Sequence, residues 1–533
     1  MHTISIQRRS FFQRISIASA AIFMVPYCVL GSESEESGPI RKVMDKVAKC
    51  CLAWLNPDQQ YLPTGGYEVA HDTGRWWDAM LRYEASTGIR IPQRAEDAMM
   101  KNLRMLTDNQ AALLTYSVCN PHNLRETMLS YTAMVCFRKS EWARIQGLRL
   151  VETIDRLLES DGQLNYMKFA ELTGKPLTND LLMMQQSPKG QWFSAVGSTG
   201  RVLEAIVWFY EATRNKTVLD LARRLAEIHL SNNIDPYGKI RPELLDPKQV
   251  SHNHSYCGTL RGLLLFGFAS GEKQYIEAVK NTYLKGIWGT SISYSGWTPH
   301  DQGQIRFPDQ YGDPVGEHAS CGDVFQIALW LALRDGQTEL LDDVERLIRA
   351  CLLPSQTIDL KNPKRDGGWG VYGHPFGGGE TFDVFSAILH SIADVYQNIV
   401  TTAPDGTLSV NLNFNIDTPS FTVHSKRNKS ASLYVTPKYS APLRIRVPAW
   451  TSRNSVLLFQ GDKPLPLHWD GSYPVVRKRK VTVGKTIILR HDLPQKETVE
   501  EMPVSHRQFH LSWRGDEVIA CNPEVDIYST SHL

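Results

Sequence analysis

Hydrophobic positions between residues 40 and 400 repeat with the period of a helix, in two different ways. In one kind of segment the apolar residues fall on a single stripe, as in 145–158 and 340–352. In the other kind they surround the whole helix, as in 202–210 and 324–331. A striped helix keeps one face in water, whereas a helix that is apolar all round has to be buried. The pattern therefore predicts an inner and an outer set of helices.

Short polar or glycine-rich stretches introduce the inner helices, and six of them recur along the chain. Each interval between them, from 53 to 73 residues, is long enough for an inner helix, an outer helix and their loops. This spacing predicts a closed (α/α)6 barrel over residues 32–402. An open solenoid is the alternative, but its inner helices would have neighbours on two sides only and need not be apolar all round. The six stretches are 71–75, 125–127, 197–201, 251–254, 316–318 and 377–380.

The hydrophobic period changes to two beyond residue 403. Leu408, Val410, Leu412 and Phe414 alternate with polar residues, which is typical of a half-buried strand. Further strand-like runs separated by turns follow, and together they predict an antiparallel β-sandwich over 403–533. The fold class is therefore a multidomain α+β protein. The further runs are 432–436, 443–447, 475–483 and 486–490.

The N-terminus has the pattern of an export signal. Arg8 and Arg9 precede an apolar stretch over 15–30, and a polar, acidic run follows it. This resembles a bacterial twin-arginine signal peptide, which we place at 1–31. We expect a periplasmic or secreted protein without a permanent membrane span after signal removal.

The overall charge excludes one broad class of partner. The 533 residues carry 58 Lys and Arg against 56 Asp and Glu, a formal charge of +2. Such a balance gives no field that would attract nucleic acid or an anionic membrane. The basic run Arg477–Lys480 lies inside a strand pattern, and we interpret it as a solvated strand face. The nine cysteines are odd in number and mostly lie in apolar surroundings, as buried free thiols do.

Parallel inner helices in a closed ring bring their N-terminal ends together at one mouth. Polar residues that are scattered in sequence then converge there. Many such residues are ordinary helix caps, but four histidines at three of the six openings favour a polar pocket for a carbohydrate. The candidate substrate-binding residues are His71, Asp72, Arg75, Trp76, His252, His254, Trp297, His318 and His374.

Several local motifs resemble glycoside hydrolase family 127, the β-L-arabinofuranosidase group. The resemblance covers most of the chain, and none of the motifs is a strict signature. They are Gly74-Arg75-Trp76-Trp77-Asp78-Ala79, the segment 251–272 ending in Ala269-Ser270-Gly271-Glu272, the segment 317–331, and Leu443-Arg444-Ile445-Arg446-Val447-Pro448-Ala449-Trp450.

The resemblance implies a zinc site, and this sequence departs from it. In the family, Glu-x-Cys at the fifth inner helix joins a Cys-Cys pair at the sixth, and one thiolate is the nucleophile. Here Glu317 stands four residues before Cys321, Gly377–Glu380 occupies the place of the pair, and no cysteine lies between Cys351 and Cys521. Three or four protein ligands are normal for zinc. We therefore expect no thiolate-zinc centre, no metal ligands and no cofactor.

Without a thiolate-zinc centre, we expect carboxyl groups to catalyse the hydrolysis of a glycosidic bond. That reaction needs an acid for the leaving oxygen and a second carboxylate as base or nucleophile. The family's acid glutamate lies sixteen residues before its zinc-binding glutamate, so the resemblance implies Asp301 as the acid. Glu317 and Glu380 open adjacent inner helices and are the candidates for the second role, with helix capping as the alternative.

Three other functions stay open at this point. A polysaccharide lyase would use the His, Asn and Tyr side chains of 252–256, and an unsaturated-uronide hydrolase would use an aspartate such as Asp72. A relative that has lost its chemistry would only bind glycan. From the barrel, the carboxyl groups and the signal peptide we expect an exported glycoside hydrolase acting on oligosaccharides from plant, algal or microbial polysaccharide. No sequence signal selects a particular sugar, linkage or oligomeric state.

Overall fold

The computed structural model describes residues 38–63, 67–177, 195–235, 237–370 and 381–523. The expected signal peptide at 1–31 lies outside these residues. Among the helices that are described, none combines the length and apolar character needed to cross a bilayer.

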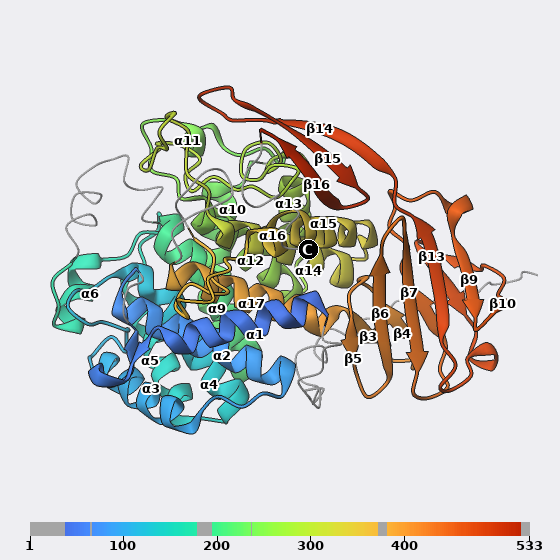
Figure 1. The fold of residues 1–533 in the computed structure, drawn as a ribbon. Helices are drawn as coiled ribbons and strands as arrows, with labels where there is room; N and C mark the ends of the chain where they lie inside the picture. Colours follow the sequence, from blue (N-terminus) through green and yellow to red (C-terminus); the bar gives the residue numbers. More distant parts are fainter. Residues whose placement is uncertain (1–37, 64–66, 178–194, 236, 371–380, 524–533) are drawn as a thin grey trace, which may run out of the picture.

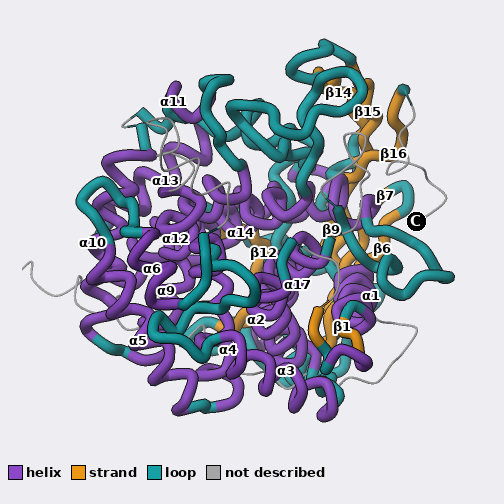
Figure 2. Tube along the Cα trace, turned by 90° about the vertical axis from the view of Figure 1, so that its left-hand side faces the viewer, coloured by secondary structure: helices purple, strands orange, loops and turns teal. Residues whose placement is uncertain are grey.

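The inner helices form a closed ring, as the sequence predicts. Each one contacts the next in chain order, and the last, α17, contacts the first, α2. Figure 2 shows them at the centre of the molecule with the outer helices around them. The inner helices are α2 (Val69–Thr87), α4 (Leu124–Arg138), α9 (Arg201–Thr213) with the π-helical turn η4 (Ala195–Gly200) before it, α12 (Asn253–Ser270), α14 (His318–Arg334) and α17 (Phe382–Asn398).

Each inner helix is backed by an outer helix. The outer partner of α17 is α1, which precedes the whole ring in sequence and so joins the two ends of the barrel. The outer helices are α1 (Pro39–Ala53), α3 (Gln93–Leu106), α5 (Glu141–Leu157), α10 (Lys216–Asn233), α13 (Lys273–Lys285) and α15 (Leu341–Leu347), which continues into η6 (Ile348–Leu352) and α16 (Leu353–Ser355). Shorter helices in the connections are η2 (Pro57–Gln59), η3 (Pro121–Asn123), α6 (Tyr166–Thr173), α11 (Pro242–Leu245) and η5 (Thr338–Leu340).

Glycines set the closest approaches between inner helices. A Cβ on Gly74 of α2 would lie 2.7 Å from the main-chain oxygen of Glu126 in α4. A Cβ on Gly262 of α12 would lie 2.9 Å from the main-chain nitrogen of Glu204 in α9. Backbone cannot yield as a flexible side chain can, so these two contacts require glycine and fix how tightly the ring closes.

The strands of the C-terminal region begin at Val400, two residues after α17 ends at Asn398. They form two sheets packed as a sandwich beside the barrel (Figure 1). One sheet has the order β10-β9-β13-β7-β6-β5 and the other has the order β11-β12-β8-β4-β3. Their strands are β3 (Val400–Thr402), β4 (Leu408–Val410), β5 (Ile416–Asp417), β6 (Phe421–Arg427), β7 (Ser430–Pro437), β8 (Leu443–Ile445), β9 (Leu457–Gln460), β10 (Lys463–Pro464), β11 (Trp469–Asp470), β12 (Tyr473–Val476) and β13 (Ile487–Asp492).

A third sheet leaves the sandwich and covers part of the barrel. Figure 1 shows β14 (Gln495–Glu501), β15 (Gln508–Arg514) and β16 (Glu517–Asn522) lying against the helices. This sheet grips the loop before α14: Asp313 accepts hydrogen bonds from the backbone of Val504 and Ser505, both at 2.9 Å. Glu500 accepts a further bond from the backbone of Ser295 at 2.6 Å. A small two-stranded sheet, β1 (Leu55–Asn56) and β2 (Leu62–Pro63), lies before α2.

The fold class is confirmed, with three local corrections. The pair β4–β8 is parallel, although we expected an antiparallel sandwich. The basic run 477–480 is not part of a strand, because Lys478–Lys480 forms the exposed turn η8. Ile145, which we placed on the buried stripe of its helix, is 47% exposed. The remaining short helix, η7, spans Arg453–Ser455.

One buried arginine joins the sandwich to the barrel. Arg446 follows β8 and pairs with both Glu345 and Asp342 of α15. The backbone of Asn413 and of Ala449 completes the site by donating to these two carboxylates, at 2.8 and 2.7 Å. Burial would lower the pKa of Arg446, but the two carboxylates raise it above its ordinary value, so the guanidinium stays charged.

Replacement of Arg446 by alanine should strongly destabilise the protein. It would remove the closest cation of the buried Glu345 and leave Arg349 at 3.8 Å, and breaking a buried pair in this way costs up to about 3–5 kcal/mol. The measurement is the free energy of unfolding in urea. The control is Lys438→Ala, which removes an exposed pair with Asp417 in the same domain and should leave the curve nearly unchanged. Coincident unfolding curves for the two variants would contradict this account of the interface.

Candidate active site

The first turns of the inner helices bring their polar residues to one end of the barrel, as the sequence predicts. Hydrogen bonds and ion pairs link α2, α4, α9, α12, α14 and α17 there. The contacts fall into a fully buried layer of charges and a partly exposed layer above it.

Glu126 of α4 is the centre of the buried layer. Its side chain has no exposed surface, and its Oε1 lies 3.2 Å from Arg75, 3.1 Å from Arg125 and 2.8 Å from Arg201. Burial would raise the pKa of this carboxyl, but the surrounding cations hold the pKa well below its usual range. Glu126 is therefore an ionised anchor that fixes arginines from three inner helices.

A second buried group continues this layer across the barrel. Arg261 of α12 lies 2.5 Å from Asp323 and 2.9 Å from Glu204. Asp323 accepts from Nδ1 of His254 at 2.5 Å, while Nε2 of His254 faces Arg75 at 3.1 Å. Burial holds the pKa of His254 well below its usual range, so this imidazole is neutral.

Above the buried layer, Glu317 meets two histidines. Glu317 ends the loop before α14, and its Oε2 lies 2.8 Å from Nε2 of His252 at the start of α12. The ring of His300 lies 4.6 Å from the ring of His252, centroid to centroid. One ligand-type atom from each of the three residues falls within 4.8 Å of the others. Burial would raise the pKa of Glu317, but the nearby histidines lower it.

Two more carboxyl groups lie at the same end of the barrel. Asp383 of α17 is half-buried and Asp72 of α2 is fully buried. Burial raises the pKa of Asp383, and although Arg75 opposes this rise, the result is above the ordinary value. Burial also raises the pKa of Asp72 well above its usual range, and the neighbouring Asp383 adds to the rise. A raised pKa shifts each carboxyl group toward the protonated form, which a general acid needs.

An aromatic ring stands at the rim of this site. Tyr67, just before α2, is 57% exposed, and its ring meets the ring of His71 edge-on at 5.1 Å. Its hydroxyl accepts a hydrogen bond from Asn120 at 3.2 Å, which fixes the orientation of the ring. An exposed, oriented ring of this kind is a suitable stacking surface for a sugar.

Six of the residues named from the sequence do converge. His71, Asp72, Arg75, His252, His254 and Glu317 all belong to these two layers. His71 bonds to Asn123 at 3.1 Å, and burial lowers its pKa to about 3, so it is a neutral hydrogen-bonding group. Glu380 and His374 lie outside the described residues.

Asp301 is close to the site but is not suited to the role of acid that we expected. Its carboxylate lies 2.6 Å from Arg306 and 3.1 Å from Nδ1 of His300. Burial would raise its pKa, but His300 and Arg306 lower it well below the usual range. The contacts with His300 and Arg306 favour the carboxylate form of Asp301, which suits a group that orients His300 better than a general acid.

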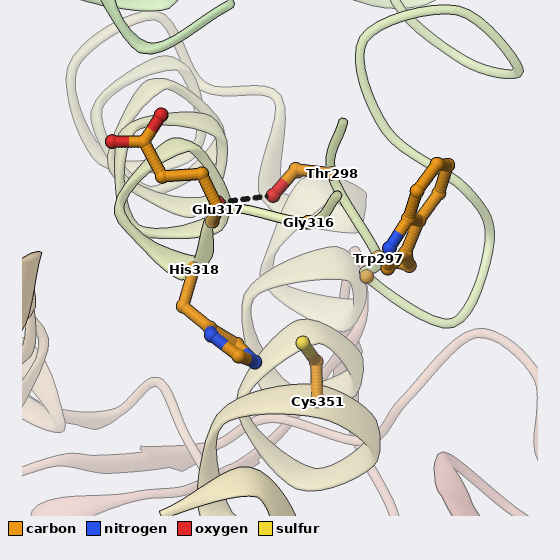
Figure 3. A pocket seen from close by; sticks show the side chains of 7 residues that line it. Trp297, Thr298, Gly316, Glu317, His318 and Cys351 are labelled. Atoms are coloured by element: carbon orange, nitrogen blue, oxygen red, sulfur yellow. Dashed lines mark hydrogen bonds between the residues drawn. The ribbon is translucent and has the colours of Figure 1, made fainter. Parts of the chain in front are cut away.

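Three other expected contact residues point elsewhere. Figure 3 shows the carboxylate of Glu317 on one side and the side chains of His318, Trp297 and Cys351 around a small cavity on the other. Nδ1 of His318 meets the main-chain oxygen of Gly370 at 3.1 Å, and Trp297 packs against the third sheet. Trp76 has no exposed surface and meets Trp77 edge-on in the core. His318 and Trp76 do lie near inner-helix starts, whereas Trp297 lies in the loop before α14, and the direction of each side chain depends on the packing around it.

Several residues of the site were not predicted from the sequence. Arg125 and Glu126 were recognised only as a helix opening, and Glu204, Arg261 and Asp323 lie one or two turns inside their helices. Asp383 could have been found as an acidic residue in the first turn of an inner helix. His300 and Tyr67 lie in loops, where no periodic signal marks them.

The thiols do not provide the zinc site that the resemblance implies. Cys321 lies one turn inside α14, is fully buried and interacts with Cys351 of η6. Burial is the main cause that raises its pKa well above the usual range, and Cys351 adds to the rise, so this sulfur favours the neutral thiol. Among the described residues the groups of potential metal ligands contain no cysteine. The family's thiolate site therefore does not fit this chain.

No protein-family model and no curated protein matches the sequence. Solved structures do match. A β-arabinofuranosidase of glycoside hydrolase family 127, BT3674, has a TM-score of 0.57 at 13% identity, over 94% of this chain and 82% of that one. The family 127 β-L-arabinofuranosidase from Geobacillus stearothermophilus T6 has a TM-score of 0.55 at 12% identity, over 90% and 80%. A structure described as a glycoside hydrolase has a TM-score of 0.53 at 13% identity, over 84% and 77%. The resemblance seen in the sequence is confirmed at the level of fold: this chain has the barrel and β-rich architecture of the family 127 glycoside hydrolases.

Proposed function

We propose that this protein is a glycoside hydrolase that cleaves its substrate at the end of the barrel where the inner helices begin. The observation that carries the proposal is that Asp383 and Glu317 lie at the starts of neighbouring inner helices, where the charge of Glu317 helps to raise the pKa of Asp383. Two carboxyl groups at one site are the minimum that glycoside hydrolysis requires. The fold shared with family 127 enzymes supports the same activity.

The two carboxyl groups take different roles in this proposal. Asp383 is half-buried and has a raised pKa, so it can hold a proton and donate it to the leaving oxygen. On the other side of the sugar, Glu317 with His252 forms the group that receives the proton of an attacking water. Arg75 connects the two sides, since it bonds to the main-chain oxygen of Asp383 at 2.9 Å and to His254 at 3.1 Å.

The proposal includes a substrate class and a location. The buried polar layer and the exposed ring of Tyr67 suit a sugar with its many hydroxyl groups, and β-L-arabinofuranosides are the first substrates to test because two structures with this fold act on arabinofuranosides. The twin-arginine pattern at 8–9 supports export, so we propose that the protein acts on oligosaccharides outside the cytoplasm.

Asp383→Asn should abolish most of the turnover of alkyl glycosides while leaving the melting temperature nearly unchanged. General acid catalysis contributes roughly 10²- to 10⁴-fold. The loss should be much smaller on 4-nitrophenyl glycosides, because nitrophenolate leaves without a proton. The measurement is kcat/KM on both substrate types over a panel of sugars. Asp97→Asn on the outer helix α3 is the control and should retain full activity. Equal losses on both substrate types would contradict the role of Asp383, and sugar binding without turnover in the unmodified protein would indicate a non-catalytic relative.

The pH profile should report the same group. Asp383 has to be protonated to act, so kcat/KM on alkyl glycosides should fall as the pH rises through its pKa, which lies above the ordinary value for aspartate. The groups that face Asp383 are Arg75 and Asp72 on α2 and Glu317 before α14. The activity that Asp383→Asn retains on nitrophenyl glycosides should lack this alkaline limb. An identical limb in the variant would assign it to another group.

Tyr67→Ala should raise KM roughly 2- to 10-fold with little change in kcat. The ring offers a stacking surface at the rim, and aromatic contacts contribute about 0.5–1.5 kcal/mol. Tyr67→Phe keeps the face of the ring and should behave almost as the unmodified protein. Tyr439→Ala, an exposed tyrosine of the sandwich, is the second control. An unchanged KM in Tyr67→Ala would exclude this ring from substrate binding.

A further inference from the structure

Two imidazoles and one carboxylate meet at the barrel mouth from two segments, the start of α12 and the loop before α14. His252 comes from the start of α12, His300 from the loop that the third sheet grips, and Glu317 from the end of that loop. Their ligand-type atoms lie within 4.8 Å of one another, and His252 Nε2 is 2.8 Å from Glu317 Oε2. Such separations allow one small cation to contact all three groups after small side-chain shifts.

Each histidine is held through its other ring nitrogen. Nδ1 of His300 lies 3.1 Å from the carboxylate of Asp301, which Arg306 holds in turn at 2.6 Å. Nδ1 of His252 faces the hydroxyl of Ser255 at 3.0 Å. In both rings Nε2 is the nitrogen left to bind a ligand. A carboxylate or hydroxyl behind each imidazole is the arrangement that orients histidines around a metal.

The site also leaves room for a further ligand. The side chains of His252 and His300 are 11% and 12% exposed, whereas Glu317 is 4% exposed. Two imidazoles and one carboxylate with an open position form a ligand set that binds zinc and related divalent transition metals. Sulfur does not take part, because Cys321 is turned toward Cys351 inside the protein.

We infer that His252, His300 and Glu317 bind one divalent transition-metal ion, with zinc as the ion that best suits this ligand set. The site differs from the glutamate-and-thiolate zinc site of family 127 in every ligand except the glutamate. It also replaces our expectation from the sequence that the chain has no metal ligands. The inference concerns binding, but it shares Glu317 and His252 with the base of the proposed hydrolase. A bound ion occupies the lone pairs that would accept the proton, so the two roles exclude one another at any one moment.

The test is zinc binding to the full chain after removal of metal with a chelator. Isothermal titration with zinc chloride should show one site, and elemental analysis after dialysis should show one zinc per chain. His252→Ala, His300→Ala and Glu317→Gln should each lower the affinity at least 10-fold. Asp301→Asn should lower it 10- to 100-fold, because it removes the group that orients His300. This last variant keeps all three ligands, so it tests the site even if a ligand variant folds poorly.

Matched controls separate this site from its neighbours. His318→Ala alters the residue next to Glu317, but that imidazole meets Gly370, so the affinity should not change. His506→Ala removes an exposed histidine and should also have no effect. Asp383→Asn should bind zinc normally, so failure of the metal site and failure of the proposed acid can be distinguished.

Cobalt substitution identifies the ligand atoms. The cobalt protein should show visible ligand-field bands without the sulfur-to-cobalt charge-transfer absorption in the near ultraviolet, and Cys321→Ser should leave the spectrum unchanged. A charge-transfer band that Cys321→Ser removes would overturn the inference in favour of a thiolate site. Absence of stoichiometric zinc, or zinc affinity that is equal in the unmodified protein and all three ligand variants, would also overturn it.

Discussion

The carboxylate of Glu126, buried at the centre of the barrel, is the interaction on which the rest of the site depends. It draws Arg75, Arg125 and Arg201 from α2, α4 and α9 to within 3.2 Å. Charges of this kind are costly to bury and are stable only when they are paired and hydrogen-bonded. These contacts therefore hold α2, α4 and α9 each in one rotation about its axis. The same rotation determines which side chains face the mouth and which face the outer helices.

The buried layer of charges fixes the positions of the groups above it. Arg75 is fixed by Glu126 and bonds in turn to His254 and to the main chain of Asp383. On the opposite side, the third sheet holds the loop that carries His300 through Asp313 and Glu500. The mouth is thus assembled from two supports of different origin. One is the ionic layer of the barrel, and the other is a sheet from the far end of the chain.

Similar carboxyl groups have different chemistry here because their surroundings differ. Arginines lower the pKa of Glu126, and His300 with Arg306 lowers that of Asp301. Asp383 and Asp72 lie where burial outweighs Arg75 and raises their pKa values. Protonation is therefore set by neighbours brought together in space. Glu317 follows the same rule, because burial would raise its pKa but the neighbouring imidazoles of His252 and His300 lower it.

The sequence by itself determined the architecture of this protein. Helical periodicity separated inner from outer helices, and strict alternation at 408–414 marked the change to strands, because both patterns record which face of a local element is buried. It also placed His71, Arg75, His252 and Glu317 at one mouth, since parallel helices in a ring share one end. Only the tertiary structure decided the direction of each side chain and its partners. Trp76 and His318 start at the right places but turn away, His300 enters from a loop, and Asp301 proves to be the partner of Arg306. Such contacts join residues that are distant in sequence or lie in irregular loops, and no local period records them.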